Sequence, residues 1–581
     1  MKSTIFRAKI LYRCLLFLIF STTIWIAHFL NSSSFGLYED DYYRISEVFD
    51  MNWLELVNCI LQRSNSQGRP LHDGFQYLLS FLGFKIAGLQ GIYFLAFTVV
   101  IANCFLFYFI LRQLSSSFIF AVSGTFAFAL FPADTTKILL THSFGIQTSI
   151  TFLLIAIFLY LIDKKYISYI FIFLTLLTYE TLFPVFLAVP LLKSKWDSKL
   201  IKELLINAAI MAGLVTSIII ARKLSIGGLG VIKEPNYLSI ILWSLKNQLF
   251  GPIFAMLMFL YRPWQVILFL KNELNLILFI SWLLLAYLFL ITCYKDSFEQ
   301  NRNNKLSTDY LHLVKNKKKL INHFSKLIIT GYIFLVLSYA LTLTESFTSV
   351  SGRASRVHSS AIFGASIIIA SICALLVFMI NSYRKRSLTA ISLAFFFTLL
   401  IGFGIIVQKD YQRSWHEQQI FWTDVIHFAP DLQDGTVVLV DGSLPHNNEQ
   451  IFSFSWSMPY LLERIYSFPK HWKMMPRLYL LKYEWETKII SNGKFLLNNE
   501  NGALNSYFPW EQARLVESSD IILLNSRDGR IIQRKNMIII NEKKYSFKKD
   551  NSQDYLTPKY NQGSLYKYII KPALKNPVRK R

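Results

Sequence analysis

Three acidic residues stand in a row immediately after the first long apolar stretch of the chain. Glu39, Asp40 and Asp41 lie within the sequence Tyr-Glu-Asp-Asp-Tyr-Tyr-Arg of residues 38–44. Adjacent carboxylates repel each other, so the pKa of one should rise unless a cation lies nearby. Such a pair can act as a general base, bind a divalent cation, or do both. Asp40 and Asp41 are therefore candidate catalytic residues and candidate metal ligands. The alternative is a solvated loop whose acids happen to follow an apolar segment.

Basic residues that suit phosphate recognition occur in three other polar segments. The candidates are Arg69 in the segment Gly-Arg-Pro-Leu, Lys137 and His142 in the segment 131–143, and Arg353 and Arg356 in the segment 352–358. A guanidinium matches the oxygens of phosphate in a bidentate manner, so the two late arginines are the best candidates. The alternatives are an interfacial histidine at position 142 and arginines that anchor lipid head groups.

One further carboxylate interrupts an apolar run. Glu180 stands in Leu-Thr-Tyr-Glu-Thr-Leu, at residues 177–182. A carboxylate inside a membrane segment is costly and needs a partner, so Glu180 is a candidate substrate-binding residue. The surrounding stretch 166–192 predicts two short spans that meet at this glutamate.

The composition is that of a membrane protein. Of the 581 residues, 53% are hydrophobic and 17% are charged, and the mean hydropathy is +0.37. Soluble domains carry about 25% charged residues, which argues against a soluble multidomain enzyme. The aromatic content of 16% excludes a disordered chain. In a membrane protein, the net charge of +24 indicates basic loops and contacts with anionic head groups or phosphates rather than nucleic acid.

Apolar stretches that can cross a bilayer recur along residues 1–408. About 20 apolar residues are needed for one crossing. Uncharged stretches of suitable length are 15–38, 89–111, 144–162, 204–221, 274–294, 327–344, 359–383 and 387–408. Two further stretches, 115–133 and 166–192, are interrupted, and the stretches 75–89 and 249–261 are ambiguous. We expect a mainly α-helical, polytopic transmembrane bundle of roughly 11–13 spans.

Basic residues near the ends of these stretches predict the orientation. Positive charge precedes the first stretch and recurs at 164–165, 193–195, 296–326 and 384–386, which predicts cytoplasmic loops. The protein would then be a multi-pass plasma (inner) membrane protein with a cytoplasmic N-terminus. All the candidate residues would share the outer side. The number of spans would be odd, and the segments between 240 and 294 do not fit that parity.

The remaining residues, 409–581, differ from the membrane module 1–408 and its first outer loop, 31–75. This region is polar and basic, and its short β-like runs at 436–440, 520–524 and 537–540 are flanked by turn residues. We expect a small extracytoplasmic α/β domain that ends in a frayed basic tail. Walker, GxGxxG, HExxH and CxxC motifs are absent from the sequence, so an ATP-driven pump is unsupported.

The order of these motifs resembles the GT-C superfamily of integral-membrane glycosyltransferases. The features that carry the resemblance are the acidic pair after the first span, the Gly-Arg-Pro-Leu that closes the first outer loop, the Tyr-Glu between two short spans and the arginine loop before a late span. The resemblance covers most of residues 1–430 as organisation plus short motifs. In the order of its motifs, the chain most resembles bacterial members related to protein mannosyltransferases and aminoarabinose transferases.

The resemblance implies an activity and roles for the candidate residues. A GT-C enzyme transfers a sugar from a polyprenyl-phosphate donor to a glycan, lipid or protein acceptor on the outer face, usually with inversion. Asp40 or Asp41 would be the base, and the sequence does not choose between them. Arg353 and Arg356 would bind the leaving phosphate, with Arg69, Lys137 and His142 as weaker candidates. Glu180 would orient the acceptor or hold a cation, and no ligand spacing decides whether a divalent cation is needed.

Three other classes of protein share some of these features. A polyprenyl-linked glycan polymerase or ligase also uses outer-face arginines, although its main loop lies late in the chain. A transporter or flippase of lipid-linked sugars would carry charges within its spans and broken helices in matched halves. A non-catalytic scaffold would not need acids and arginines gathered on one side.

Overall fold

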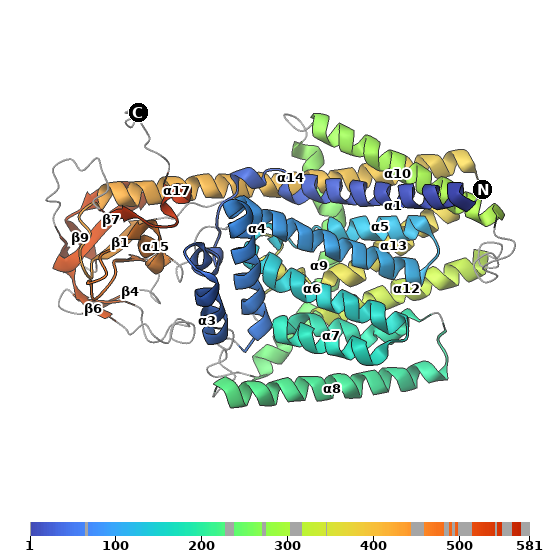
Figure 1. The fold of residues 1–581 in the computed structure, drawn as a ribbon, viewed down its shortest axis with the longest axis horizontal. Coiled ribbons are helices and arrows are strands. Elements are labelled where there is room, and N and C mark those ends of the chain that lie inside the picture. The colour runs from blue at the N-terminus through green and yellow to red at the C-terminus, as the bar shows by residue number, and fades with distance from the viewer. Residues whose placement is uncertain are drawn as a thin grey trace.

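The computed structural model describes residues 2–63, 68–193, 195–226, 237–269, 275–302, 317–343, 345–380, 382–442, 458–481, 487–490, 494–497, 514–540, 543–548 and 560–570. These residues form a long helical bundle and a strand-containing C-terminal region, which follow one another along the long axis (Figure 1). We call the end of the bundle next to the strands the domain end, and the end with the N-terminus the N-terminal end.

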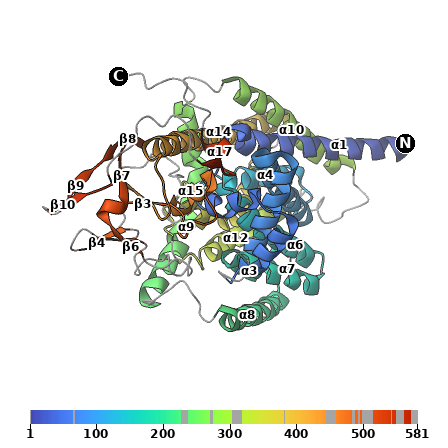
Figure 2. The same ribbon diagram turned by 60° about the vertical axis from the view of Figure 1, so that its left-hand side comes forward.

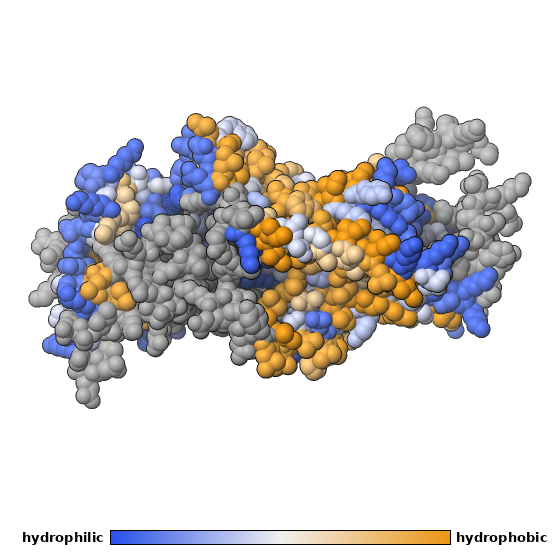
Figure 3. Space-filling view, turned by 90° about the horizontal axis from the view of Figure 1, so that it is seen from below, coloured by the Kyte–Doolittle hydropathy of each residue, from blue (hydrophilic) through white to orange (hydrophobic). Residues whose placement is uncertain are grey.

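Nine helices in the described ranges are long and apolar enough to cross a bilayer. They are α1 (Lys2–Ile24) with the short helices that follow it, α4 (Pro70–Leu114), α6 (Leu140–Leu161), α8 (Ser198–Ile226), α9 (Tyr237–Phe269), α10 (Asn275–Arg302), α12 (Lys317–Ser338), α13 (Ala361–Phe378) and α14 (Tyr383–Phe428). Hydrophobic side chains cover the middle of the bundle, and hydrophilic ones gather toward both ends of the molecule (Figure 3). The predicted class, a mainly α-helical polytopic membrane protein with a small C-terminal α/β region, is confirmed.

Three shorter apolar helices complete the bundle. They are α5 (Phe118–Ala129), α7 (Lys165–Thr178) and the 3₁₀ helix η5 (Glu180–Leu192). The carboxylate of Asp296, near the end of α10, accepts hydrogen bonds from the backbone N–H groups of Phe118 and Ile119 at 2.8 and 3.0 Å. A buried carboxylate on free N–H groups stabilises a helix start, so Asp296 joins the beginning of α5 to α10.

The two halves of the stretch 166–192 form a helical hairpin with Tyr179 and Glu180 at its tip. At the other end of the hairpin, Nζ of Lys165 and Nζ of Lys193 lie 2.9 and 3.2 Å from a carboxylate oxygen of Glu203. Both arms therefore start and finish at the N-terminal end of the bundle. The sequence predicted two short spans that meet at Glu180, and the structure has two short apolar helices that meet there.

Two segments that the sequence left ambiguous lie across the bundle. α4 contains a break at Ala87 and Gly88, where Gly88 has φ 59°, so residues 70–86 take a different direction from the following span. Figure 1 shows α3 (Trp53–Arg63) lying crosswise beside this first part of α4. The long helix α9, which contains the ambiguous stretch 249–261, also runs across the bundle rather than along it in both ribbon views (Figures 1 and 2).

The helix that carries the last predicted span, 387–408, continues beyond that span to Phe428. Its extension holds the first loop. The hydroxyl of Tyr38 donates to the carbonyl oxygen of Tyr411 at 2.9 Å, and the hydroxyl of Tyr42 donates to Oε1 of Gln418 at 2.7 Å. The ring of Trp415 fills the space that a Cβ atom on Gly36 would need. α14 thus runs through the expected boundary between residues 408 and 409 and fixes the segment that carries the acidic residues.

The C-terminal region is built on a four-stranded sheet of order β3-β1-β7-β8. β1 (Val437–Gly442) pairs in parallel with β3 (Arg477–Leu480) and β7 (Ile521–Arg527), and β8 (Arg530–Lys535) is antiparallel to β7. The expected strands at 436–440 and 520–524 are β1 and β7, and the one at 537–540 is β9 (Met537–Ile540). The predicted basic tail lies outside the described residues.

Smaller strands and helices surround this sheet. They are β2 (Tyr466–Ser467) with β11 (Asn561–Gln562), the three-stranded set β4 (Thr487–Ile490), β5 (Lys494–Leu497) and β6 (Arg514–Glu517), β10 (Lys543–Ser546) beside β9, and the helices α15 (Met458–Ile465) and α17 (Tyr566–Ile569). Arg530 contacts both carboxylate oxygens of Asp424, at 2.7 and 3.2 Å, and so ties β8 to the end of α14.

Candidate functional site

The first loop turns sharply at Glu39 and sends its three carboxylates in two directions. Glu39 has φ 45°, in the left-handed region that non-glycine residues rarely adopt and that costs on the order of 1–2 kcal/mol. The side chains of Glu39 and Asp40 face Arg353, whereas the Asp41 carboxylate faces the start of α6. The strained turn thus separates two adjacent acids that the sequence treats alike.

Asp41 is fully buried and caps a helix. Its carboxylate accepts hydrogen bonds from the backbone N–H groups of Thr141 at 2.8 Å, Leu140 at 3.3 Å and Tyr38 at 3.4 Å. Burial raises the pKa of Asp41 to about 7, against the opposite effect of the Thr141 and Leu140 donors. These contacts give Asp41 a structural role at the first turn of α6.

The titration of Asp41 should appear in the stability of the protein. Because its pKa is higher in the fold than in the unfolded chain, the native state binds more protons between pH 4 and 7, and the free energy of unfolding falls as the pH rises through this window. Asp41→Asn has no such titration. We expect the melting temperature of the wild type, relative to that of Asp41→Asn, to decline from pH 4.5 to pH 7 in nanodiscs. A difference that stays constant with pH would contradict this assignment.

Asp40 is the carboxylate that remains accessible. One of its oxygens lies 3.3 Å from Nη2 of Arg353, and its side chain is 25% exposed. The neighbouring Glu39 has an oxygen 3.5 Å from Nε of the same arginine but is only 3% exposed. Burial raises the pKa of Glu39 well above its usual value, although Arg353 opposes this effect. Of the three consecutive acids, Asp40 is therefore the one that a substrate can reach.

The second late arginine, Arg356, lies close to the same place. Arg353 and Arg356 belong to the short helix η6 (Arg353–His358), and Nη2 of Arg356 lies 3.2 Å from a carboxylate oxygen of Glu345. Oγ of Ser355, between them, accepts a hydrogen bond from the backbone N–H of Thr135 at 3.0 Å. The loop that carries the arginines thus packs on the segment that leads into α6.

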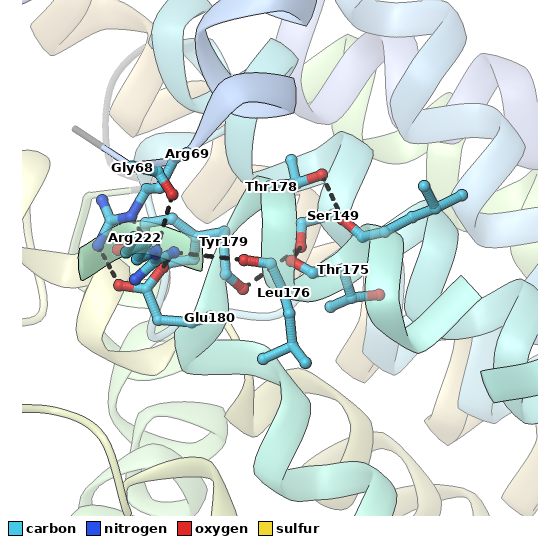
Figure 4. A network of polar contacts seen from close by, with 10 residues as sticks. Gly68, Arg69, Ser149, Thr175, Leu176, Thr178, Tyr179, Glu180 and Arg222 are labelled. Carbon is cyan, nitrogen blue, oxygen red and sulfur yellow. Dashed lines mark hydrogen bonds and ion pairs between the residues drawn. The ribbon is translucent and has the colours of Figure 1, made fainter. Parts of the chain in front are cut away.

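A second ion-pair group lies at the tip of the hairpin (Figure 4). Nε and Nη2 of Arg69 donate to the two oxygens of Glu180 at 2.8 and 2.5 Å. Arg222, near the end of α8, donates to the carbonyl oxygen of Gly68 at 2.8 Å and lies 3.4 Å from Glu180. The guanidinium of Arg69 also lies 5.0 Å from the ring centre of Tyr179, within the range of a cation–π contact. Glu180 therefore has the cationic partners that its place in an apolar run requires.

Two buried histidines lie between these ion-pair groups. Nε2 of Gln76 donates to the carbonyl oxygen of Thr141 at 2.9 Å, and it also lies 2.9 Å from Nε2 of His72. Nε2 of His72 must then accept, which puts the ring hydrogen on Nδ1. Within the described residues, Nδ1 of His72 and Nδ1 of His142 are buried and have no hydrogen-bond partner. Buried polar atoms are almost always paired, so these two suit a ligand or ordered water.

Close packing fixes the position of His72. The ring lies against the backbone at Gly145, where an added Cβ atom would come within 2.1 Å of it. The opposite neighbour is Tyr179, whose ring centre is 5.8 Å away. His72 lies at the start of α4, His142 at the start of α6 and Tyr179 at the hairpin tip, so three segments distant in the sequence meet here.

Lys137 does not join this group. It is buried, and its Nζ donates to the carbonyl oxygen of Ala129 at 2.6 Å. It lines a small cavity together with His28, Asp134 and residues of α14. Burial lowers the pKa of Lys137 to about 8. The expectation that it binds the same substrate as Arg353 therefore finds no support in its contacts.

The residues present do not fit a divalent cation held by Asp40 and Asp41. The carboxylate of Asp41 is occupied by backbone N–H groups, and that of Asp40 faces Arg353. Among the residues that the structure describes, no group of three or more His, Cys, Asp or Glu side chains could hold a metal ion. The two acids therefore do not converge on one position.

Several residues of the site were missed in the sequence. Glu39 has no sequence signal that separates it from Asp40 and Asp41, and Arg222 follows an apolar run, where a basic residue usually marks topology. Glu345 and His72 carried no signal beyond their closeness to candidate motifs. The pairing of Arg44 with Asp73 links the two ends of the first loop and was also not foreseen.

Comparisons with known proteins leave the family open. No protein-family model matches the chain, and no curated protein does. Among solved structures, the crystal structure of ArnT from Cupriavidus metallidurans in the apo state is similar at 12% sequence identity and a TM-score of 0.30, over 78% of this chain and 84% of that chain. A likeness of this strength carries no argument about fold or activity.

Proposed function

We propose that this protein is a membrane glycosyltransferase of the GT-C type. It transfers a sugar from a polyprenyl-phosphate donor to an acceptor hydroxyl on the extracytoplasmic face, with inversion. The observation that carries the proposal is the contact of Asp40 with Arg353 at the domain end of an apolar bundle, with Arg69, Glu180 and two buried histidines nearby. In this orientation the N-terminus is cytoplasmic, and the domain end with its α/β region faces outward.

The proposed reaction is a single displacement at the anomeric carbon of the donor sugar. The carboxylate of Asp40 accepts the proton of the acceptor hydroxyl while its oxygen attacks the anomeric carbon. The bond between that carbon and the phosphate oxygen breaks, and the phosphate leaves with the electron pair. Fixed cations stabilise the charge that develops there, and Arg353 is the best placed to supply it. No step requires a cofactor.

Arg353, Arg356 and Arg69 are each already paired with an acid. A phosphate that binds one of these arginines must therefore also weaken its existing ion pair. Arg353 contacts Glu39 and Asp40, Arg356 contacts Glu345, and Arg69 contacts Glu180. A phosphate that takes up the Arg353 guanidinium must weaken its contact with Asp40. We propose that donor binding thereby releases the Asp40 carboxylate to act as the base. The neutral Nδ1–H of His72 adds a donor that no acid occupies.

A transfer assay on the full-length protein tests this function. The protein is placed in nanodiscs with polyprenyl-phosphate-linked hexoses and pentoses that carry a radiolabelled sugar, together with envelope extract as the source of acceptor. We expect at least one sugar to leave the lipid and free polyprenyl phosphate to appear. If every sugar stays on its lipid while proteoliposomes move the intact lipid-linked sugar across the bilayer, the protein is a flippase and the proposal is wrong.

A further inference from the structure

The helix α9 has the hydropathy of a membrane span but touches only one end of its neighbours. Near its middle, Gly251 lies against the ring of Tyr339, just past the end of α12. Further along, Phe259 packs on Phe131, just past the end of α5, with ring centres 5.8 Å apart. Val266 then contacts Gly402 of α14. A span would descend along its neighbours, whereas α9 passes over the domain ends of α12 and α5 and then crosses the middle of α14.

One face of α9 makes hydrogen bonds to residues 342–350. This segment leads to the arginine loop, residues 352–358, which carries Arg353 and Arg356. Nδ2 of Asn247 donates to the carbonyl oxygens of Thr342 and Glu345 at 2.9 and 3.0 Å, and its Oδ1 accepts from the backbone N–H of Phe347 at 3.2 Å. Nη2 of Arg262 donates to the carbonyl oxygen of Val350 at 2.5 Å. Two side chains on one helix thus fix both halves of residues 342–350.

Aromatic packing completes this contact. The ring of Phe347 lies between Phe250 and Phe254 of α9, with centres 5.7 and 5.2 Å away. Glu345, whose backbone Asn247 holds, carries the carboxylate that pairs with Arg356. The positions of Arg353 and Arg356 therefore depend on α9.

We infer that α9 is an in-plane helix in the lipid leaflet at the domain end, and that Asn247 is a positioning residue for the arginine loop. The face of α9 away from the loop exposes large apolar side chains that continue the apolar surface of the bundle, so bilayer lipid covers it. These side chains include Leu249, Ile253, Leu257, Leu260 and Trp264. Both ends of α9 then lie on the same side of the membrane, which also resolves the parity problem between residues 240 and 294.

Cysteine labelling tests the in-plane orientation without reference to any activity. The native cysteines are replaced, and single cysteines are placed at Ser239, in the first turn of α9, and at Leu276, in the first turn of α10. Lys473 marks the domain end and Lys195 the N-terminal end. We expect a membrane-impermeant maleimide to label Ser239→Cys and Leu276→Cys from the side that labels Lys473→Cys, opposite to Lys195→Cys. Labelling of the first two from opposite sides would overturn the inference.

A binding experiment tests the role of Asn247 and rests on the proposed function. Undecaprenyl phosphate and undecaprenol, which lacks the phosphate, are titrated onto the full-length protein in nanodiscs. The preference is the ratio of the affinity for undecaprenyl phosphate to the affinity for undecaprenol. We expect Asn247→Ala to lower this ratio about tenfold, because the arginines are no longer held in place. The matched control is Asn207→Ala, since Asn207 is also buried and donates to the carbonyl oxygens of Phe186 and Leu187.

The possible outcomes distinguish a failure of the positioning role of Asn247 from a failure of the proposed function. The control should lower the melting temperature as Asn247→Ala does but keep the preference for phosphate. If the wild type prefers phosphate and Asn247→Ala keeps that preference, the positioning role is wrong. If the wild type shows no preference, the proposed function fails and the positioning role falls with it, while the labelling still decides the orientation of α9.

Discussion

Replacing Asp40 by Asn should lower the rate of sugar transfer by about 10²–10⁴-fold, the usual contribution of a general base. The amide has the shape of the carboxylate but cannot accept the acceptor proton. Because Asp40 is partly exposed, its ion pair with Arg353 contributes little to stability, and the protein should keep its fold. The transfer assay with a labelled polyprenyl-phosphate sugar measures this effect, and binding of undecaprenyl phosphate should remain.

The matched control is the same substitution one residue later. Asp41→Asn removes a carboxylate from the first turn of α6, where it accepts three backbone N–H groups. We expect it to cost about 1 kcal/mol of stability, as the loss of a helix cap does, and to change the transfer rate only a few-fold. Loss of activity in Asp41→Asn with full activity in Asp40→Asn would reverse the two roles and refute the assignment.

The contrast between these two acids shows where sequence reasoning stops. Composition and apolar run length predicted the bundle, the C-terminal strands and the hairpin around Glu180, because bilayer thickness and strand alternation leave clear patterns. The roles of Asp40 and Asp41 depend on a left-handed turn at Glu39. A single non-glycine residue in that conformation leaves no pattern that a sequence can reveal.

The sequence also could not predict which groups the basic residues contact. Arg353 and Lys137 were both candidates because each stands in a polar segment next to a span. The structure puts Arg353 against Glu39 and Asp40, whereas Lys137 turns inward to the carbonyl oxygen of Ala129. Which of two cations faces a site depends on the packing of distant helices, and local composition does not record it.

The helix α9 illustrates a limit of hydropathy itself. Its mean hydropathy passes the test for a span, and polar contacts such as those of Asn247 and Arg262 mark it as different. Polar side chains in an apolar helix usually face protein rather than lipid. Their partners lie past the end of α12, however, and the sequence alone does not identify them.

Replacing Arg353 by Ala should weaken the binding of undecaprenyl phosphate and lower the rate of transfer by about 10²–10³-fold, as the loss of one donor to a developing charge does. Arg353→Lys should recover only part of the rate, because an ammonium lacks the planar fork that matches two phosphate oxygens. Arg413→Ala is the control. Arg413 is a largely exposed arginine paired with Glu417 one helical turn away, and its loss should change neither quantity.

Arg353→Ala also takes this cation away from the buried Glu39, which must then bind a proton or remain as an unpaired buried charge, a state that costs roughly 3–5 kcal/mol. The double variant Glu39→Gln with Arg353→Ala removes that charge. It should therefore recover much of the melting temperature lost in Arg353→Ala, while phosphate binding stays weak. If binding returns together with stability, Arg353 acts only by neutralising Glu39 and does not contact the phosphate. If stability returns alone, the guanidinium supplies the charge that the leaving phosphate needs.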